Sequence, residues 1–158
     1  MMTPAVVALQ RAGIRHTVHA YEHDPGSDSY GLEAAHGLDV PGERVFKTLV
    51  ARDEGGGLLV ALVPVTAHLD LKRLAAAHGS KRVAMAPPAE AQRATGYVVG
   101  GISPLGQKRR LPLWLDRSAL AHSTVYVSAG RRGLEIELAP GDLLELTGGR
   151  TAEIARTG

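Results

Sequence analysis

The sequence predicts one domain of mixed α/β (α+β) structure, with helices packed on a mixed β-sheet. Its 158 residues suit a single hydrophobic core, and 44% hydrophobic residues is an ordinary value for a globular chain. Helix-like and strand-like segments alternate, yet two strand pairs are joined by glycine-rich hairpin signals, which disfavours a purely parallel sheet. No linker, repeat or low-complexity tract divides the chain. We therefore interpret residues 1–158 as one domain.

Capping residues and glycines mark the helices. Thr3 followed by Pro4 is typical of an N-cap and first helical position, and Gly13 of a helix end. Asp70 and Gly79 bracket another segment in the same way. The expected helices cover residues 5–12, 31–36, 71–78 and 88–94, and a further helix begins at Asp142.

Apolar runs rich in β-branched residues, bounded by turn residues, predict the strands. They cover residues 16–21, 45–52, 58–64, 83–85, 97–99, 112–116, 124–128 and 134–138. Residues 53–57 and 129–133 are glycine-rich and short, so they predict hairpin loops between consecutive strands.

Cysteine is absent from the chain, which excludes disulfides, thiolate metal sites and a cysteine nucleophile, and suits a reducing compartment. The first 13 residues have neither the basic nor the apolar region of a signal peptide. No apolar run reaches the roughly 18 residues needed to span a bilayer. We therefore expect a cytoplasmic protein without a membrane partner.

Charge alone does not indicate nucleic-acid binding, because 18 Lys and Arg against 16 Asp and Glu leave a net charge of only +2. The basic residues that cluster beside glycines are Lys108, Arg109, Arg110, Arg131 and Arg132. Two local basic loops predict a limited phosphate contact. Aromatic residues make up 4% of the chain, so any RNA is expected to bind by its backbone and end.

The densest motif is the glycine-rich run of residues 100–110, GGISPLGQKRR. Its glycines would let the backbone approach a ligand closely, and the basic residues that follow could meet phosphate. It is not a Walker A loop, because Gln107 stands where lysine is required, and its spacing does not match a nucleophile elbow. A solvated turn with a charged exit remains the alternative.

Lys47 is the second candidate. Strand alternation places it on the same face as Val45 and Leu49. A lysine among aliphatic neighbours either extends its ammonium to solvent at the sheet edge or is held there for an anionic ligand. Spacing alone leaves both interpretations open.

Two further groups of polar residues are weaker candidates. His16, His19 and His23 lie near Glu22, but on a strand the first two point to opposite faces, and no fourth ligand follows from spacing. We expect no metal site. Separately, Ser128 and Glu135 face each other across the proposed hairpin. They could form a polar pair near a site or a surface contact.

Six segments carry a resemblance to a known family. They are TPAVVALQRAGI, HAYEHDP, VFKTLV, VTAHLDLKRLAAAHG, AQRATGYVVGGISPLGQKRRLP and VYVSAGRRGLEIEL. Together they resemble the YbaK family of Cys-tRNA(Pro) deacylases, free-standing relatives of the editing domain inserted in bacterial prolyl-tRNA synthetases. The likeness covers nearly the whole chain, and GYVVGGISPLGQKRRLP is its most specific part. It implies a curved, mostly antiparallel sheet.

The resemblance also implies a site. Lys47 matches the family's essential lysine, which grips the phosphate near the terminal adenosine, and Gly101 matches the glycine of the G-x-x-P loop that positions the amino acid. The implied substrate-binding residues are Tyr21, Tyr30, Thr48, Gly100, Ser103, Pro104, Ser128 and Glu135. Two departures stand out: Glu135 occupies a position where relatives can carry Asp, and Ala129 replaces an expected glycine.

Aminoacyl-ester hydrolysis normally uses a nucleophile, a general base or a metal-bound water, and the sequence offers none of these clearly. The resemblance implies a cofactor-free, substrate-assisted reaction in which the cysteine thiol attacks its own ester. The implied partners are the acceptor end of mischarged tRNA and prolyl-tRNA synthetase. A deacylase for alanine or another small amino acid, and a non-catalytic module that binds tRNA ends or a synthetase, remain alternatives.

Overall fold

The computed structural model describes residues 2–22 and 30–157, except for the side chains of residues 30 and 31. The strands are β1 (Thr17–Ala20), β2 (Phe46–Asp53), β3 (Leu58–Pro64), β4 (His68–Leu69), β5 (Val83–Met85), β6 (Leu113–Asp116), β7 (Val125–Ser128), β8 (Leu134–Leu138), β9 (Arg150–Ala152) and β10 (Ala155–Arg156). The helices are α1 (Pro4–Ala12), α2 (Tyr30–Leu38), α3 (Leu71–His78), α4 (Pro88–Thr95) and α5 (Pro140–Thr147), with 3₁₀ turns η1 (Gly42–Arg44) and η2 (Arg117–Ala121).

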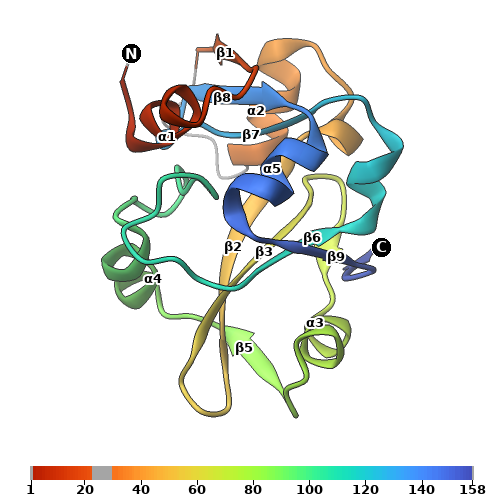
Figure 1. Cartoon of the computed structure of the whole chain (residues 1–158). Coiled ribbons are helices and arrows are strands. Elements are labelled where there is room, and N and C mark those ends of the chain that lie inside the picture. Colours follow the sequence, from red (N-terminus) through yellow and green to blue (C-terminus); the bar gives the residue numbers. More distant parts are fainter. Residues whose placement is uncertain (1, 23–29, 158) are drawn as a thin grey trace.

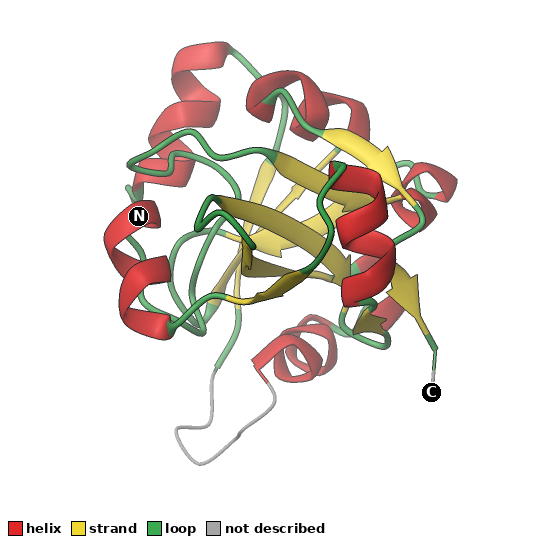
Figure 2. Ribbon diagram, turned by 90° about the horizontal axis from the view of Figure 1, so that it is seen from below, coloured by secondary structure: helices red, strands yellow, loops and turns green. Residues whose placement is uncertain are grey.

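Two sheets form the centre of the molecule (Figure 1). The larger has the strand order β5-β2-β3-β6-β9, with antiparallel pairs around β2 and parallel pairs from β3 to β9. The smaller is antiparallel, with the order β1-β8-β7. A bridge between Val45 and Tyr126 joins them. Helices lie around the outside of the strands (Figure 2), so the predicted mixed sheet with packed helices is confirmed.

The helix caps form as the sequence predicts. The Thr3 hydroxyl accepts a hydrogen bond from the Val6 amide at the start of α1. Asp70 accepts one from the Arg73 amide at the start of α3, and Gly79 ends that helix in the left-handed conformation. The predicted bounds 71–78, 58–64, 83–85 and 134–138 match the structure to the residue.

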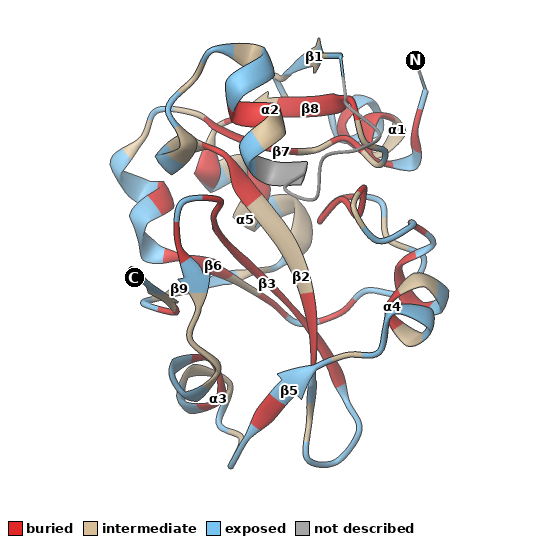
Figure 3. Ribbon diagram, turned by 180° about the vertical axis from the view of Figure 1, so that it is seen from behind, coloured by how far each residue is buried: buried red, intermediate tan, exposed pale blue. Residues whose placement is uncertain are grey.

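The strand β3 lies at the centre of the core and is buried along its whole length (Figure 3). Successive side chains alternate between two hydrophobic clusters. Val60 and Leu62 pack in the larger cluster, which includes residues of α1 and of the smaller sheet, while Leu59 and Ala61 pack in a second cluster with residues of α3. This arrangement fixes the position of β2, the partner of β3 in the larger sheet.

The predicted strand at residues 97–99 is wrong. Tyr97 is buried in a turn, and its hydroxyl donates a hydrogen bond to the Leu105 carbonyl at 2.7 Å. Tyr97 anchors this turn in the core, and with the two valines that follow it the segment resembles a strand. In the described part of the chain, no helix is long and apolar enough to cross a membrane.

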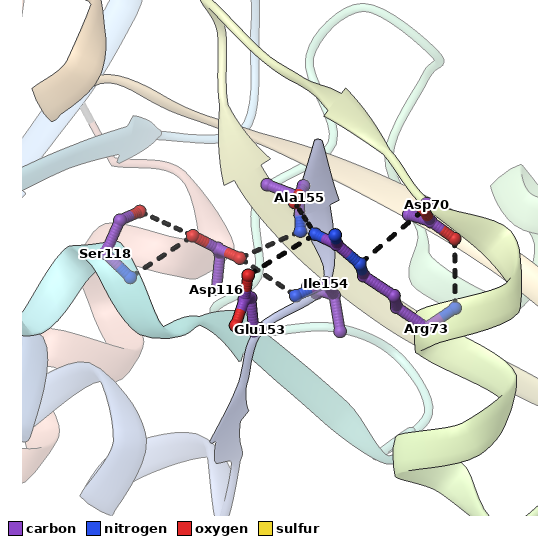
Figure 4. A network of polar contacts seen from close by, with 7 residues as sticks. All are labelled: Asp70, Arg73, Asp116, Ser118, Glu153, Ile154 and Ala155. Carbon is purple, nitrogen blue, oxygen red and sulfur yellow. Dashed lines mark hydrogen bonds and ion pairs between the residues drawn. The ribbon is translucent and has the colours of Figure 1, made fainter. Parts of the chain in front are cut away.

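A buried carboxylate fastens the C-terminal strands to the sheet (Figure 4). Asp116, at the end of β6, accepts hydrogen bonds from the amides of Ile154 and Ala155 at 3.0 and 2.9 Å. It also accepts hydrogen bonds from the amide and the hydroxyl of Ser118. Arg73 of α3 donates to the Ala155 carbonyl at 2.7 Å, so the same tail is also held to α3.

Candidate active site

A cavity of about 440 Å³ lies beside β2, between the two sheets. Its walls come from β2, the β5–α4 segment, the loop after Tyr97 and the β7–β8 hairpin. The sequence-predicted residues that line it are Tyr21, Lys47, Thr48, Gly100, Ser128 and Glu135. Residues separated by more than 100 positions in the chain therefore meet around one hollow.

The cavity exists because part of one edge of β2 has no paired strand. Among the described residues, β5 pairs on that edge only with residues 51–53, and β7 of the smaller sheet, which lies close to the other end of β2 (Figure 3), is joined by a bridge at Val45. The five residues 46–50 between these contacts all line the cavity. Lys47 and Thr48 point to opposite faces of the strand, so a cavity that touches both must run along its open edge.

The Lys47 side chain is half-buried at this edge. Burial lowers the pKa of its ammonium group below the usual value. The ammonium forms no ion pair with any residue that the structure describes. A desolvated cation without a counter-ion attracts an anionic group, and this setting suits a ligand more than a solvent-exposed lysine at a sheet edge.

Ser128 and Glu135 are directly paired across the β7–β8 hairpin, as predicted, and both face the cavity. Glu135 is 6% exposed, so the pair is no surface contact. Burial raises the pKa of Glu135 to about 8, and its carboxyl group therefore carries a proton at neutral pH. The extra methylene relative to Asp is accommodated within the buried wall.

Gly101 does not line this cavity but lines a second hollow of about 450 Å³, next to Gly100. Its amide donates to the Val98 carbonyl at 2.9 Å, and its carbonyl accepts from the Ser128 hydroxyl at 3.2 Å. An added Cβ at Gly101 would stand 2.8 Å from the Arg131 Cα. The close approach of two protein loops therefore requires glycine at this position, and a contact between its backbone and a ligand stays a prediction.

Gly100 and Ile102, on either side of Gly101, do line the cavity. Their amide groups form no hydrogen bond with any described residue. The glycine-rich loop thus offers two main-chain donors next to the cavity.

Two other predicted loop residues lie elsewhere. Ser103 is fully buried, and its hydroxyl accepts a hydrogen bond from the Leu105 amide at 3.2 Å. Pro104 lines a separate hollow of about 220 Å³. The structure does not bring either residue to the cavity that holds Lys47. Tyr30 begins α2, but its side chain lies outside the described residues.

The predicted phosphate contacts at residues 131 and 132 differ from each other. Arg132 forms a double hydrogen bond with Glu33 of α2, at 3.0 and 3.1 Å, so its charge is already paired. Both arginines line the second hollow of about 450 Å³, which shares Val99 and Gly100 with the main cavity, but only Arg131 is exposed. Arg131 is therefore the better placed of the two for an RNA phosphate.

The run Lys108, Arg109 and Arg110 is exposed. Arg109 and Arg110 line the 220 Å³ hollow beside α1 and α5, which shares no lining residue with the main cavity. A phosphate held by these arginines would thus belong to a part of the ligand away from Lys47.

An apolar rim was missed by the sequence analysis. Leu32, Met85 and Val99 line the cavity and are 49%, 48% and 47% exposed. They come from α2, β5 and the loop before Gly100. No pattern in the sequence identifies them, because their exposure at one rim follows only from the way the three segments meet.

The histidines make ordinary structural contacts. His16 Nδ1 is hydrogen-bonded to the Ile14 carbonyl, and His19 Nε2 to Glu137. His23 lies outside the described residues. Among the residues that the structure describes, no group of three His, Cys, Asp or Glu side chains could hold a metal ion.

Both the sequence and the fold are similar to those of known proteins. The family model of the aminoacyl-tRNA editing domain matches residues 25–146. The "Putative Cys-tRNA(Pro)/Cys-tRNA(Cys) deacylase EbsC" of Enterococcus faecalis is 43% identical over 135 residues, which are 85% of this chain and 82% of that protein. A crystal structure described as "a putative trans-editing enzyme for prolyl tRNA synthetase" is similar with a TM-score of 0.85, at 28% identity over 99% of both chains. The structure of the hypothetical protein APE2540 gives a TM-score of 0.87 at 26% identity, over 98% of this chain and all of that one.

Proposed function

The chain belongs to the family of aminoacyl-tRNA editing domains, and we propose that it is a trans-editing deacylase that hydrolyses the ester of mischarged Cys-tRNA(Pro). The single observation that carries the proposal is the Lys47 ammonium, which is half-buried in a cavity of about 440 Å³ and has no counter-ion among the described residues. The name and identity of the Enterococcus relative support the choice of cysteine and of tRNA(Pro).

Lys47 binds a phosphate near the 3′-terminal adenosine and so holds the ester within the cavity. A hydrogen bond between charged groups contributes roughly 1.5–3 kcal/mol, which corresponds to about ten- to hundredfold in binding or rate. The apolar rim of Leu32, Met85 and Val99 gives the adenosine a surface to lie against as the aminoacyl group enters.

The chemistry of the wall favours assistance by the substrate. Among the described residues no histidine lines the cavity, and the Ser128 hydroxyl already donates to the Gly101 carbonyl and accepts from the Gly130 amide. Glu135 is protonated at neutral pH and is therefore a poor general base. The lining residues thus offer no activated nucleophile.

In the proposed reaction the cysteine sulfur attacks its own ester carbonyl. A carbon–sulfur bond forms, the carbon–oxygen bond to the ribose breaks, and the thiol proton ends on the released tRNA hydroxyl. Water then opens the cyclic thioester to give free cysteine. The amides of Gly100 and Ile102 donate hydrogen bonds to the oxyanion that develops on the carbonyl, and the cavity keeps the reacting atoms close together.

The first experiment compares Lys47→Ala with Lys72→Ala, a change of an exposed lysine on α3 away from the cavity. We expect Lys47→Ala to lose deacylation of Cys-tRNA(Pro) while retaining the thermal stability of the wild type, and Lys72→Ala to keep the activity. Normal turnover by Lys47→Ala would show that this ammonium does not hold the substrate.

The second experiment separates the mechanisms and the rival substrates. Cys-, Ser-, Ala- and Pro-charged tRNA(Pro) are incubated with the protein, and the remaining ester is counted. Thiol assistance predicts fast loss of cysteine only. Equal rates for cysteine and alanine would refute it, preference for alanine would indicate a deacylase for small amino acids, and binding without turnover would indicate a non-catalytic module.

Prolyl-tRNA synthetase is the proposed partner that supplies tRNA selectivity, in keeping with the trans-editing relative. Cys-tRNA(Cys) and Cys-tRNA(Pro) are compared with and without that synthetase. We expect the synthetase to raise the preference for tRNA(Pro). An unchanged ratio would show that the deacylase selects its tRNA without this partner.

A further inference from the structure

The open edge of β2 presents unpaired main-chain groups to the cavity. In the antiparallel ladder with β3, Val45 and Asp53 exchange hydrogen bonds with the β3 side, since the Val45 carbonyl accepts from Val65 and the Asp53 amide donates to Gly57. The Val50 carbonyl instead accepts from Ala86, on the opposite edge. Because the ladder alternates, the amide and carbonyl of Thr48 also point away from β3.

In the described part of the chain no strand is paired with this edge at Thr48, because β5 pairs with β2 only from residue 51 onward, and β7, which runs close to β2, is bridged to the chain at Val45. No ladder or bridge among the described residues engages the amide or carbonyl of Thr48 on this edge, and the residue lines the cavity. The amide and carbonyl of Thr48 are thus available to pair with one residue of a ligand inside the proposed active site.

A second, independent observation marks the same residue. The Thr48 hydroxyl oxygen is buried and has no hydrogen-bond partner among the described residues. A buried polar atom without a partner costs free energy unless a ligand or water completes it. It lies on the face of β2 that also carries Phe46 and Val50, which line the cavity as well.

We infer that the substrate's aminoacyl group pairs with Thr48 as a one-residue antiparallel strand. The inference rests on the proposed function. The α-ammonium of the amino acid donates to the Thr48 carbonyl, and the ester carbonyl accepts from the Thr48 amide. The Thr48 amide is then an oxyanion donor on the wall opposite the glycine-rich loop.

This pairing also selects chirality. Directly opposed residues of an antiparallel pair place their side chains on the same face of the sheet. The side chain of an L-amino acid would therefore lie on the Thr48 face, among Phe46, Val50 and Ile102, with the unpartnered hydroxyl beside it. A D-amino acid bound by the same two hydrogen bonds would point its side chain to the Lys47 face instead.

Substrate variation tests the inference without altering the protein. Wild-type protein is given tRNA(Pro) charged with L-cysteine, with D-cysteine or with 3-mercaptopropionate, which keeps the thiol and the ester but lacks the α-amine. Each rate is divided by the spontaneous hydrolysis rate of the same ester. We expect the acceleration to fall about ten- to hundredfold without the amine, as for the loss of a charged hydrogen bond, and to fall at least about tenfold for D-cysteine.

Protein variation tests the amide itself. Thr48→Pro and Thr48→Ala both lack the hydroxyl, but only proline also lacks the amide hydrogen. Proline is tolerated at a strand edge that needs no donor, so Thr48→Pro should fold, whereas Leu49→Pro should not, because the Leu49 amide pairs with β3. We expect Thr48→Pro to deacylate L-Cys-tRNA(Pro) at least about tenfold more slowly than Thr48→Ala.

The outcomes separate the two proposals. No hydrolysis of L-Cys-tRNA(Pro) by the wild type would overturn the proposed function itself. Hydrolysis with equal acceleration of all three esters, or equal rates for folded Thr48→Pro and Thr48→Ala, would overturn the pairing alone. If Thr48→Pro fails to fold, the open edge is contradicted as well.

Discussion

Replacement of Glu135 by glutamine should make the protein more stable than the wild type, by an amount that grows as the pH rises. It does so although it removes a residue of the proposed active site. Glu135 is buried, and this burial raises the pKa of its carboxyl group from 4.5 to about 8. Glutamine has nearly the same shape and cannot ionise. In the wild type, folding costs free energy at any pH where the carboxyl group is ionised in the unfolded chain, because burial forces it to take up a proton. The glutamine variant does not have this cost.

The sign follows from the two states of the chain. Below about pH 4.5 Glu135 is protonated in both states, and its contribution to stability is complete. Between pH 4.5 and about 8 the unfolded chain loses the proton while the folded chain keeps it, so the wild type loses stability. At about 1.4 kcal/mol for each pKa unit, the loss is roughly 3 kcal/mol at pH 7 and roughly 5 kcal/mol above pH 8.

The assay is urea unfolding of both proteins at several pH values from about 5 to 8.5. We expect the glutamine variant to gain on the wild type by several kcal/mol across this range. Glu137→Gln is the matched control, because Glu137 lies two residues along β8, and hydrogen bonds from Thr124 and His19 lower its pKa. That control should show no such gain. A stability difference between Glu135→Gln and wild type that stays constant with pH would refute the reasoning.

Three further outcomes are expected. Gly101→Ala should lower stability by about 1–3 kcal/mol and reduce deacylation, since its Cβ would stand 2.8 Å from the Arg131 Cα; thermal unfolding and ester counting check this. Arg131→Ala should weaken tRNA binding and reduce its salt dependence by about one ion, whereas Arg132→Ala should instead lower stability because it leaves Glu33 without this partner; binding titrations at several salt concentrations, with unfolding curves, separate the two. Asp116→Asn should speed hydrogen exchange in the C-terminal strands. Burial raises the pKa of Asp116, but the hydrogen bonds it accepts outweigh this and lower it, so its contribution to stability is present at neutral pH and is lost as the pH falls through the folded-state pKa.

Local signals in the sequence predicted the elements that local chemistry controls. Asp70 and Gly79 bracket α3 because a cap and a left-handed glycine need only nearby backbone groups. The turn at Ala129 is regular because Gly130 supplies the positive φ of 113°, so the replacement of the expected glycine has no consequence there.

The rest depends on pairings between distant segments. The C-terminal strands β9 and β10 were missed, because they are two or three residues long and are held by Asp116 and by parallel pairing with β6. Lys47 was identified by strand alternation and by resemblance, and Thr48 by resemblance, but alternation alone could not show that β2 has no paired strand at these residues. The pairing of Arg132 with Glu33 likewise joins residues 99 positions apart.

The unpartnered stretch of β2 has a consequence for how molecules of this protein meet one another. An uncovered row of amides and carbonyls normally invites a second polypeptide to add on, which is how many proteins begin to aggregate. Here the row is interrupted at Val45 by the smaller sheet and at Ala51 by β5, so it is too short to template an intermolecular strand. Because the unpaired stretch is short, it can pair with the single aminoacyl residue of a substrate but not with a strand of another protein molecule.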